Sequence, residues 1–447
     1  MFAPVAQALT RPLSAEHVLG WAGDRPVTWG EIRARAFGVS RALAEQRARG
    51  AVLACSSPIN FFAALLGTWL QRGEALVPQS LQPESVSGLA RSQVPVLADE
   101  DVLPLHSAHA EATLPPPEEC RLALHTSGST GAAKRVDKTL EQFDREIENL
   151  QAVWGHALDG ASVLATVPHY HIYGLLFRVL WPFAAARPAD GASCADPVEL
   201  RTLAAKRGRY VLVSTPAHLA RFPDLMPLAE WVRPAGIFSS GGPLDAASAA
   251  RYRQGFGGAP FEVFGSTETG GVAWRQRDGS ALEDAWTPFP GIRVAVGREG
   301  ALVIDSPYLP QRDWQMDDGA EMLSDDRFML RGRLDRIVKV AGKRLSLPEL
   351  EQLLARHEWV AAAGALRLPG QERVAVVVAP SAAGAAAMQE KGARAVREEL
   401  RRHLGRTLDP SLLPRWFRFV DKLPFDERGK LPVAQLERLF ETPADDA

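Results

Sequence analysis

The stretch HTSGSTGAAK, residues 125–134, carries the strongest signal in the sequence. It places four hydroxyl side chains, two glycines and Lys134 in ten residues. Glycines let the backbone approach an anion, hydroxyls donate hydrogen bonds, and lysine supplies positive charge. The spacing is not that of a G-x-x-x-x-G-K-[ST] loop. Because the stretch follows a strand-like run at 121–125 and precedes a helical pattern at 140–154, we interpret it as a polyphosphate-binding loop rather than a flexible polar linker.

Strand-like runs and helical patterns alternate on both sides of this loop. Upstream, a helix that begins near Thr28 with a capping partner at Glu31, a strand at 51–54, a buried helix at 60–70 and a strand at 75–78 predict parallel βαβ units. Downstream, three short apolar runs are each followed by a turn of small residues; they span 210–214, 236–239 and 261–264. Loops after strand ends are where open α/β sheets bind ligands.

The composition changes near residues 332–335, and a different pattern follows. A helix that begins at Ser346 with Glu349 as its capping partner precedes a strand, a charged helix and a second strand, expected at 373–378, 393–404 and 416–420. The Ala/Gly-biased residues 382–387 are expected to be a surface excursion. The pattern predicts a small α+β domain of about 110 residues at the C-terminal end.

The composition indicates a globular protein and gives no sign of a zinc site or of a nucleic-acid or membrane partner. The 447 residues are 46% hydrophobic and 23% charged, which is ordinary for a globular protein. The 51 basic and 53 acidic side chains leave a net charge of −2, which gives no electrostatic reason to expect a nucleic acid or an anionic membrane as partner. Three distant cysteines without a C-x-x-C pair argue against a zinc site. With no apolar run that would serve as a signal peptide or membrane span, we expect a cytoplasmic protein.

The loop resembles the phosphate-binding signature of the adenylate-forming superfamily, which includes acyl-CoA synthetases, nonribosomal peptide adenylation domains and luciferases. The family pattern is [ST]-[ST]-G-[ST]-T-G-x-P-K, and Ala133 replaces its proline. The resemblance implies that Lys134 acts in catalysis. It also implies that ATP phosphates are bound by six residues of the loop, which are Thr126, Ser127, Gly128, Ser129, Thr130 and Gly131.

Two further motifs fall in the family's order. Residues 264–268, FGSTE, are similar to Y-G-x-T-E, which implies that Phe264 and Gly265 lie against adenine, that Thr267 contacts phosphate and that Glu268 holds Mg²⁺. Taken alone, Glu268 would equally suit a helix cap. Residues 239–244, SSGGPL, resemble a turn that packs on the base through Gly241 and Gly242, although by itself a Gly-Gly-Pro sequence predicts only a turn.

The later motifs complete the resemblance. Asp318 lies 14 residues before Gly332, which is the family spacing between a ribose-binding aspartate and the dipeptide that contains Arg333, but Met316-Asp317 replaces the usual Thr-Gly. Residues 332–344 resemble the interdomain hinge motif, which implies that Asp335 is the hinge and that Gly342 lines the thiol tunnel. Residues 424–430, PFDERGK, resemble the terminal motif, which implies that Lys430 bridges the carboxylate and the α-phosphate.

Residues 168–175, PHYHIYGL, resemble the family segment P-x-x-H-x-x-G that walls the acyl site. The implied pocket residues are His171, Tyr173, Gly174, Ser214 and Thr215. A metal site at His169 and His171 is disfavoured because no third ligand is near. Amino-acid-activating relatives supply an aspartate here for the substrate ammonium, and this segment has none. Its aromatic residues favour a flat or apolar acid.

The sequences around the phosphate loop and around the acid-site segment also resemble those of ligases from aryl-polyene and xanthomonadin pigment clusters. Those ligases load hydroxybenzoate-type acids onto an acyl carrier protein.

The implied fold is α/β. It has a large N-terminal adenylate-forming core domain of layered mixed sheets with flanking helices, residues 1–334, and a small mobile α+β C-terminal lid domain, residues 335–447. The implied substrates are a small carboxylic acid, ATP with Mg²⁺, and the thiol of an acyl carrier protein or CoA. Three alternatives stay open, namely a medium- or long-chain fatty acyl-CoA synthetase, a non-catalytic adenylate-binding protein and a scaffold protein.

Overall fold

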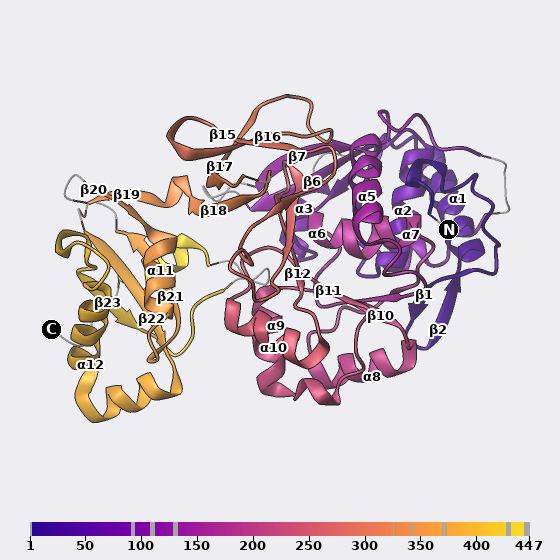
Figure 1. Cartoon of the computed structure of the whole chain (residues 1–447). Coiled ribbons are helices and arrows are strands. Elements are labelled where there is room, and N and C mark those ends of the chain that lie inside the picture. Colours follow the sequence, from indigo (N-terminus) through magenta and orange to yellow (C-terminus); the bar gives the residue numbers. More distant parts are fainter. Residues whose placement is uncertain are drawn as a thin grey trace. The chain divides into compact units, whose positions relative to one another are not determined.

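A computed structural model gives the structure of the chain (Figure 1). It describes residues 2–90, 94–107, 112–127, 133–324, 326–340, 343–368, 371, 373–425 and 431–441. The contacts between Cα atoms divide the chain into two compact units. Unit 1 comprises residues 1–293 and 305–312, and unit 2 comprises residues 294–304 and 313–447.

Unit 1 is built on two sheets. Within the described residues, the strands of the larger sheet follow one another in the order β14 (Thr287–Pro288), β13 (Gly270–Gln276), β12 (Phe261–Ser266), β11 (Gly236–Ser239), β10 (Tyr210–Ser214), β8 (Ser162–Ala165), β9 (Ala189–Asp190), β1 (Val18–Ala22) and β2 (Arg25–Thr28). The order in the smaller sheet is β5 (Val96–Leu97), β3 (Gly50–Leu53), β4 (Glu74–Val77), β6 (Arg121–Ser127) and β7 (Ala133–Thr139). Parallel pairing of β3 with β4, and of β8, β10, β11 and β12 in turn, confirms the predicted βαβ units.

Helices cover these sheets on both sides. They are α1 (Trp29–Glu45), α2 (Pro58–Leu70), α3 (Pro83–Ala90), α4 (Asp99–Val102), α5 (Leu140–Trp154), α6 (Ile172–Gly174), α7 (Trp181–Ala184), α8 (Pro197–Arg207), α9 (Pro216–Leu225) and α10 (Ala246–Phe256). Shorter helices are η1 (Val5–Gln7), η3 (Leu228–Glu230) and the π-helix η2 (Leu175–Leu180). Among the described helices, none is both long and apolar enough to cross a membrane.

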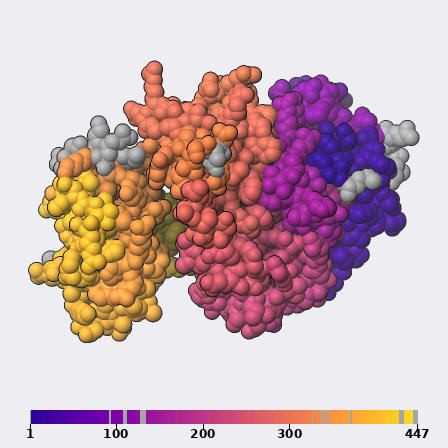
Figure 2. Space-filling view, in the orientation of Figure 1, coloured from indigo at the N-terminus to yellow at the C-terminus, as the bar shows by residue number. Residues whose placement is uncertain are grey.

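The two faces of the larger sheet bury different sets of side chains. Helices α8, α9 and α10 run along one face of β10 and β11 (Figure 1) and form a continuous outer surface in the space-filling view (Figure 2). On the other face, Trp154 of α5 packs against aromatic rings from η2, α7 and the sheet itself, which are Phe177, Trp181, Phe238, Phe261 and Trp274. This face therefore packs an apolar core, in which tilted and edge-to-face aromatic pairs add to the stabilisation from buried apolar area.

Unit 2 contains three smaller sheets among the residues described. They are formed by β15 (Arg293–Val296), β16 (Ala301–Asp305), β17 (Trp314–Met322) and β18 (Phe328–Arg333); by β19 (Ile337–Val340) and β20 (Lys343–Ser346); and by β21 (Val360–Arg367), β22 (Val374–Pro380) and β23 (Trp416–Phe419). Its helices are α11 (Leu347–Ala355), α12 (Ala382–Leu404) and α13 (Val433–Arg438), with η4 (Arg298–Gly300), η5 (Leu334–Arg336) and η6 (Pro410–Leu412).

The mixed α/β fold and its division into a large N-terminal and a smaller C-terminal part match the prediction. The compact units divide within the strands β15–β18, ahead of residue 335, so the domain boundary and the hinge at Asp335 stay predictions. One local expectation was wrong. Residues 382–387 are the first turns of α12, capped by Ser381, whose hydroxyl accepts from the Gly384 N–H. The kink at Gly392 (φ 79°) separates them from the charged part of that helix.

Candidate active site

The predicted phosphate loop is flanked by the strands β6 and β7. Strands β6 and β7 pair antiparallel, with Ser127 opposite Ala133, so the loop does not lead directly into α5 as the sequence suggested. The strand β7 was missed because its sequence, AKRVDKT, is mostly charged. Gly128, Ser129, Thr130 and Gly131 lie outside the described residues, as does the side chain of Ser127. The Thr126 hydroxyl lies 3.4 Å from the carbonyl oxygen of Lys134 across the hairpin.

Lys134 and Glu268 meet in the structure, although they come from different sheets. The Lys134 Nζ lies 2.6 Å from Oε1 of Glu268, which directly follows β12. Burial acts to raise the pKa of Glu268, but the hydrogen bond and the charge of Lys134 outweigh it and hold that pKa below its ordinary value. The Glu268 carboxylate is therefore ionised at neutral pH, beside the cationic end of the phosphate loop.

The turn that carries Thr267 and Glu268 is held by its own hydroxyl groups. The backbone N–H of Ser266 donates to Oγ1 of Thr269 at 3.0 Å, and the N–H of Thr269 donates to Oγ of Ser266 at 3.1 Å. Thr267 is half-buried between these two residues. The turn is thus fixed locally, as expected where Ser and Thr side chains bond to nearby backbone groups.

The residues predicted to contact the base come from two neighbouring strand ends. Phe264 of β12 lies 5.6 Å from Trp286, ring centroid to centroid. Gly241 and Gly242 are exposed in the turn after β11, and Gly241 has a φ of 91°, which favours glycine. Because β11 and β12 are adjacent and parallel, the aromatic ring and the glycine turn share the carboxyl edge of the sheet.

A buried cluster of charges anchors that glycine turn. The Glu262 carboxylate accepts from Arg275 (2.9 Å), from Arg277 (2.7 Å) and from the backbone N–H of Leu244 (2.9 Å), which ends the turn. Arg277 also donates to the Leu244 carbonyl. The half-exposed Asp284 contacts both arginines. Glu262 is 2% exposed and each arginine 7%, so the carboxylate holds the turn from within the fold.

A polar cluster lies at the ends of β8 and β10, where Ser214 and Thr215 were predicted to line the acid site. The Thr166 hydroxyl lies 2.9 Å from Oγ of Ser214 and 2.9 Å from Nδ1 of His218. Thr215 Oγ1 lies 3.2 Å from the same ring nitrogen. Burial lowers the pKa of His218, and nearby Arg221 lowers it further, so the ring is neutral at pH 7. The neutral ring can therefore donate or accept a hydrogen bond.

Sequence reasoning missed Thr166, His218 and Ser239. Ser239 is opposite Ser214 in the register of β11 and β10, and its buried hydroxyl has no hydrogen-bond partner in the described part of the chain. Thr166 and His218 belong to no motif, and Ser239 lies in the SSGGPL motif but was not predicted as a site residue. For Thr166 and Ser239 the available signal was position, because Thr166 directly follows β8 and Ser239 ends β11, where polar groups gather around ligands. His218 lies in the first turn of α9, after the end of β10.

The segment predicted to wall the acid site leads into the helices α6, η2 and α7. A Cβ atom at Gly174 would collide with the Pro168 carbonyl, which explains the glycine at this position. The Tyr173 ring lies 5.0 Å from that of Phe177, and its buried hydroxyl lies beside the backbone of Ser214. His171 is half-buried in the turn before α6. His169 is buried, its Nε2 lies 3.0 Å from the Cys55 carbonyl, and burial lowers its pKa to about 3, which suits a structural role.

In unit 2, Asp318 of β17 lies opposite Arg333 of β18 in the antiparallel register. The structure therefore places the predicted ribose-binding pair on neighbouring strands. The neighbouring Asp317 lies 3.3 Å from Arg333. The side chain of Asp335 is not among those described, and Gly342 and Lys430 lie outside the described residues.

Glu268 has the chemistry of a ligand for Mg²⁺ that is shared with a nucleotide. No group of three or more His, Cys, Asp or Glu side chains gathers in a metal-binding arrangement among the residues described. Mg²⁺ in nucleotide sites usually takes one or two carboxylates and completes its shell with water and phosphate oxygens. A single ionised carboxylate beside a phosphate loop therefore fits this metal.

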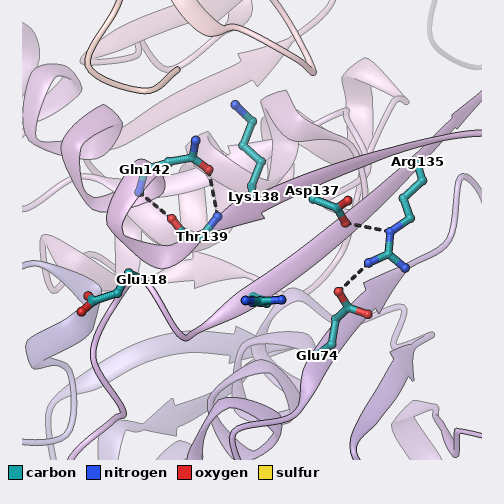
Figure 3. Close-up of a pocket in the computed structure, with 8 residues that line it drawn as sticks. Glu74, Glu118, Arg135, Asp137, Lys138, Thr139 and Gln142 are labelled. Carbon is teal, nitrogen blue, oxygen red and sulfur yellow. Dashed lines mark hydrogen bonds and ion pairs between the residues drawn. The ribbon is translucent and has the colours of Figure 1, made fainter. Parts of the chain in front are cut away.

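A polar cleft of about 280 Å³ opens on the other side of β7 (Figure 3). Its charges are paired with one another, because Arg135 lies 2.7 Å from Asp137 and 2.5 Å from Glu74. Thr139 and Gln142 form the capping box of α5 at its edge. We assign this cleft no ligand.

Comparisons with known proteins agree with this geometry. A family model described as AMP-binding enzyme matches residues 68–307, and one described as AMP-binding enzyme C-terminal domain matches residues 349–430. The chain is 30% identical to the 4-coumarate–CoA ligase of Rhodobacter capsulatus over 322 residues, which cover 70% of this chain and 75% of that protein. It is 26% identical to the benzoate–CoA ligase of Thauera aromatica over 368 residues, which cover 73% and 67%.

Among solved structures, ATP-bound MatB from Rhodopseudomonas palustris is similar, with a TM-score of 0.81 and 19% identity over 99% of both chains. At that identity the likeness concerns the fold. The two family models together match segments of both units of the chain.

Proposed function

The chain belongs to the AMP-binding enzyme family, and we propose that this member activates a hydroxybenzoate-type aryl acid and transfers it to the phosphopantetheine thiol of an acyl carrier protein. The chain is an AMP-forming acid–thiol ligase that uses ATP and Mg²⁺. The observation that carries the proposal is the meeting of Lys134 with Glu268 at 2.6 Å beside the phosphate loop. It supports a site for a metal-bound polyphosphate.

The chemistry proceeds in two steps. First, a carboxylate oxygen of the acid bonds to the α-phosphorus of ATP, and the bond from that phosphorus to pyrophosphate breaks. Lys134 and Lys430 place positive charge where the phosphoryl oxygens gain negative charge. Glu268 would hold Mg²⁺, which would supply further positive charge to the phosphates when bound. Second, the thiol sulfur bonds to the carbonyl carbon of the acyl-adenylate, and AMP leaves.

The aryl part of the proposal is supported by the side chains around the ends of β8, β10 and β11. Tyr173 is half-buried and packs on the buried Phe177, and a planar ring that stacks on the exposed part of Tyr173 gains about 0.5–1.5 kcal/mol beyond its burial. The predicted acid segment contains no carboxylate, so an amino acid would leave its ammonium without a partner, which costs several kcal/mol in practice.

The hydroxyl on the ring is assigned to the polar cluster. The neutral His218 and the buried, unpaired hydroxyl of Ser239 each have hydrogen-bonding capacity that a phenol can fill. Each such bond contributes on the order of 1 kcal/mol net, which is enough to favour a hydroxybenzoate over benzoate by roughly tenfold when more than one forms.

A panel of acids in an ATP–pyrophosphate exchange assay tests this proposal. We expect 3- or 4-hydroxybenzoate to give the highest kcat/KM, ahead of benzoate, octanoate, dodecanoate and amino acids. In His218→Phe, which removes the polar ring but keeps an aromatic one, we expect the preference for hydroxybenzoate over benzoate to fall by about fivefold, the effect of one lost hydrogen bond of about 1 kcal/mol. His156→Phe, at an exposed histidine of the same unit, is the matched control and should keep the preference.

Two results would contradict the aryl assignment. If octanoate or dodecanoate exceeds every benzoate, the acid site is an apolar tunnel and the chain is a fatty acyl ligase. If His218→Phe and the His156→Phe control retain the same preference, the hydroxyl is recognised elsewhere.

CoA is the second candidate for the acceptor thiol, and the names of the relatives favour it, since these are CoA ligases. Because CoA and a carrier protein present the same phosphopantetheine thiol, supplying each in turn to the preformed acyl-adenylate separates them. Faster release of AMP with CoA than with a panel of carrier proteins would replace the carrier assignment and leave the ligase itself intact.

A further inference from the structure

Two buried charged side chains lie beneath the turn that carries Glu268. Lys138 of β7 is 3% exposed, and its Nζ donates to the backbone carbonyl of Glu268 at 2.8 Å. Glu146 of α5 is 2% exposed, and its Oε1 accepts from the backbone N–H of Gly271 at 2.5 Å. One charge thus holds the middle of the turn and the other holds its exit into β13.

Because side chains alternate between the two faces of β7, Lys134 and Lys138 lie on the same face and both contact Glu268. Lys134 and Lys138 leave one side of the strand, with the buried Val136 between them, because side chains two residues apart share a face. Lys134 contacts the carboxylate of Glu268, and Lys138 contacts its carbonyl. Lys138 extends away from Arg135 and Asp137, although all three residues line the cleft beside β7 (Figure 3).

Gly270 shows how closely Glu146 approaches the turn. It has a φ of 69°, and a Cβ atom built there would lie 2.5 Å from Oε2 of Glu146. The carboxylate therefore packs directly against the backbone, and a side chain at position 270 would push it away. The position of the Glu146 carboxylate therefore depends on glycine at position 270.

Burying the charges of Lys138 and Glu146 costs free energy, because both groups lose their hydration. Burial lowers the pKa of Lys138, while the charges of Glu146 and Glu268 act to raise it. Burial raises the pKa of Glu146 to about 7, against the opposing effect of Lys138 and the Gly271 N–H. A pair of apolar side chains of similar volume would often be as stable or more so. Stability alone therefore gives no reason for this pair.

We infer that Lys138, supported by Glu146, is a positioning residue that holds the backbone of Glu268 so that its carboxylate faces Lys134. The inference rests on the proposed role of Glu268 as the Mg²⁺ ligand. Partners that orient a metal ligand typically contribute 10–100-fold to metal affinity without touching the metal. Lys138 acts in this way through a carbonyl rather than through the carboxylate itself.

The test compares Lys138→Met, Glu146→Gln and the double variant with the unchanged protein. ATP binding is measured by titration calorimetry with Mg²⁺ and again in EDTA, and the thermal midpoint is recorded for each variant. We expect Lys138→Met to weaken binding of Mg·ATP by about tenfold and binding of ATP in EDTA by less than about twofold. Lys206→Met, an exposed lysine of the same unit that pairs with Asp24 at 2.9 Å, is the control and should match the unchanged protein.

The double variant separates positioning from stability. It removes both buried charges, so its thermal midpoint should return toward that of the unchanged protein, while Mg·ATP binding stays weak because the Glu268 carbonyl still lacks its donor. Should Lys138→Met fail to fold, the double variant carries the same test. Mg·ATP binding that recovers together with the midpoint, or that is unaffected in both variants, overturns the inference.

Glu268→Gln separates a failure of the Lys138 positioning role from a failure of the proposed function. If it weakens Mg·ATP binding but the Lys138 variants do not, the positioning role fails and the proposed function stands. If it leaves Mg·ATP binding unchanged, Glu268 is not the metal ligand, and the inference is overturned together with that part of the proposed function.

Discussion

Replacing Lys430 with alanine is expected to lower the rate of adenylate formation by about 10²–10³-fold, or roughly 2.7–4 kcal/mol of transition-state stabilisation. The reason is that the carboxylate and the α-phosphate are both anions, and the proposed lysine neutralises them only as they meet. ATP binding should change little, because the interaction is made mainly in the transition state. The measurement is acid-dependent ATP–pyrophosphate exchange together with the dissociation constant of ATP.

The second half-reaction provides the internal control. When acyl-adenylate is supplied directly, Lys430→Ala should transfer the acyl group to thiol at nearly the normal rate. Lys422→Ala, which removes an exposed lysine eight residues earlier, should leave both steps intact. An equal loss in the two half-reactions would mean that Lys430 supports the fold rather than the adenylation step.

Glu262→Gln is expected to cost about 3 kcal/mol of stability, at the lower end of the range for breaking a buried ion pair. The carboxylate is the shared partner of Arg275 and Arg277, and a neutral amide leaves both buried guanidinium groups short of charge. Asp284 compensates in part, because it also contacts both arginines. A loss of this size lowers the thermal midpoint of unit 1 by roughly 5 °C.

The matched control is Glu230→Gln, which removes an exposed carboxylate that lies 3.0 Å from Arg201 in the same unit. Exposed pairs contribute about 0–1 kcal/mol, so its midpoint should stay within roughly 2 °C of the unchanged protein. If the two variants unfold at the same temperature in a calorimetric scan, the Glu262 cluster does not hold the glycine turn in the way the contacts indicate.

Local signals in the sequence were sufficient for many elements of the fold. The capping box of Thr28 and Glu31 begins α1 as predicted, because both groups that form it lie within one helical turn. The apolar runs at 210–214 and 236–239 are the buried strands β10 and β11. Strand β7 was missed because its partner β6, rather than its own charged sequence, makes it a strand.

The candidate site was predictable where it lies in motifs and not where it depends on tertiary contacts. The family resemblance assigned Lys134 and Glu268 to one site, and in the structure the Lys134 Nζ lies 2.6 Å from Oε1 of Glu268. Lys138, Glu146 and Glu262 read as ordinary surface charges in the sequence, since charged residues are almost never fully buried unless they are paired. Their partners lie on other strands and helices, so no local pattern reveals them.

The most direct test of the central claim, that this chain forms an acyl-adenylate, is a single turnover without thiol. The protein is mixed with a smaller amount of ATP, with Mg²⁺ and with each acid of the panel in turn. The products are then separated and identified by mass spectrometry. With the best acid, we expect one equivalent of pyrophosphate per ATP and an enzyme-bound acyl-adenylate. When a phosphopantetheine thiol is added, the acyl-adenylate should be consumed and AMP released. ADP and phosphate as products, or no acid-dependent pyrophosphate from any member of the panel, would contradict the claim.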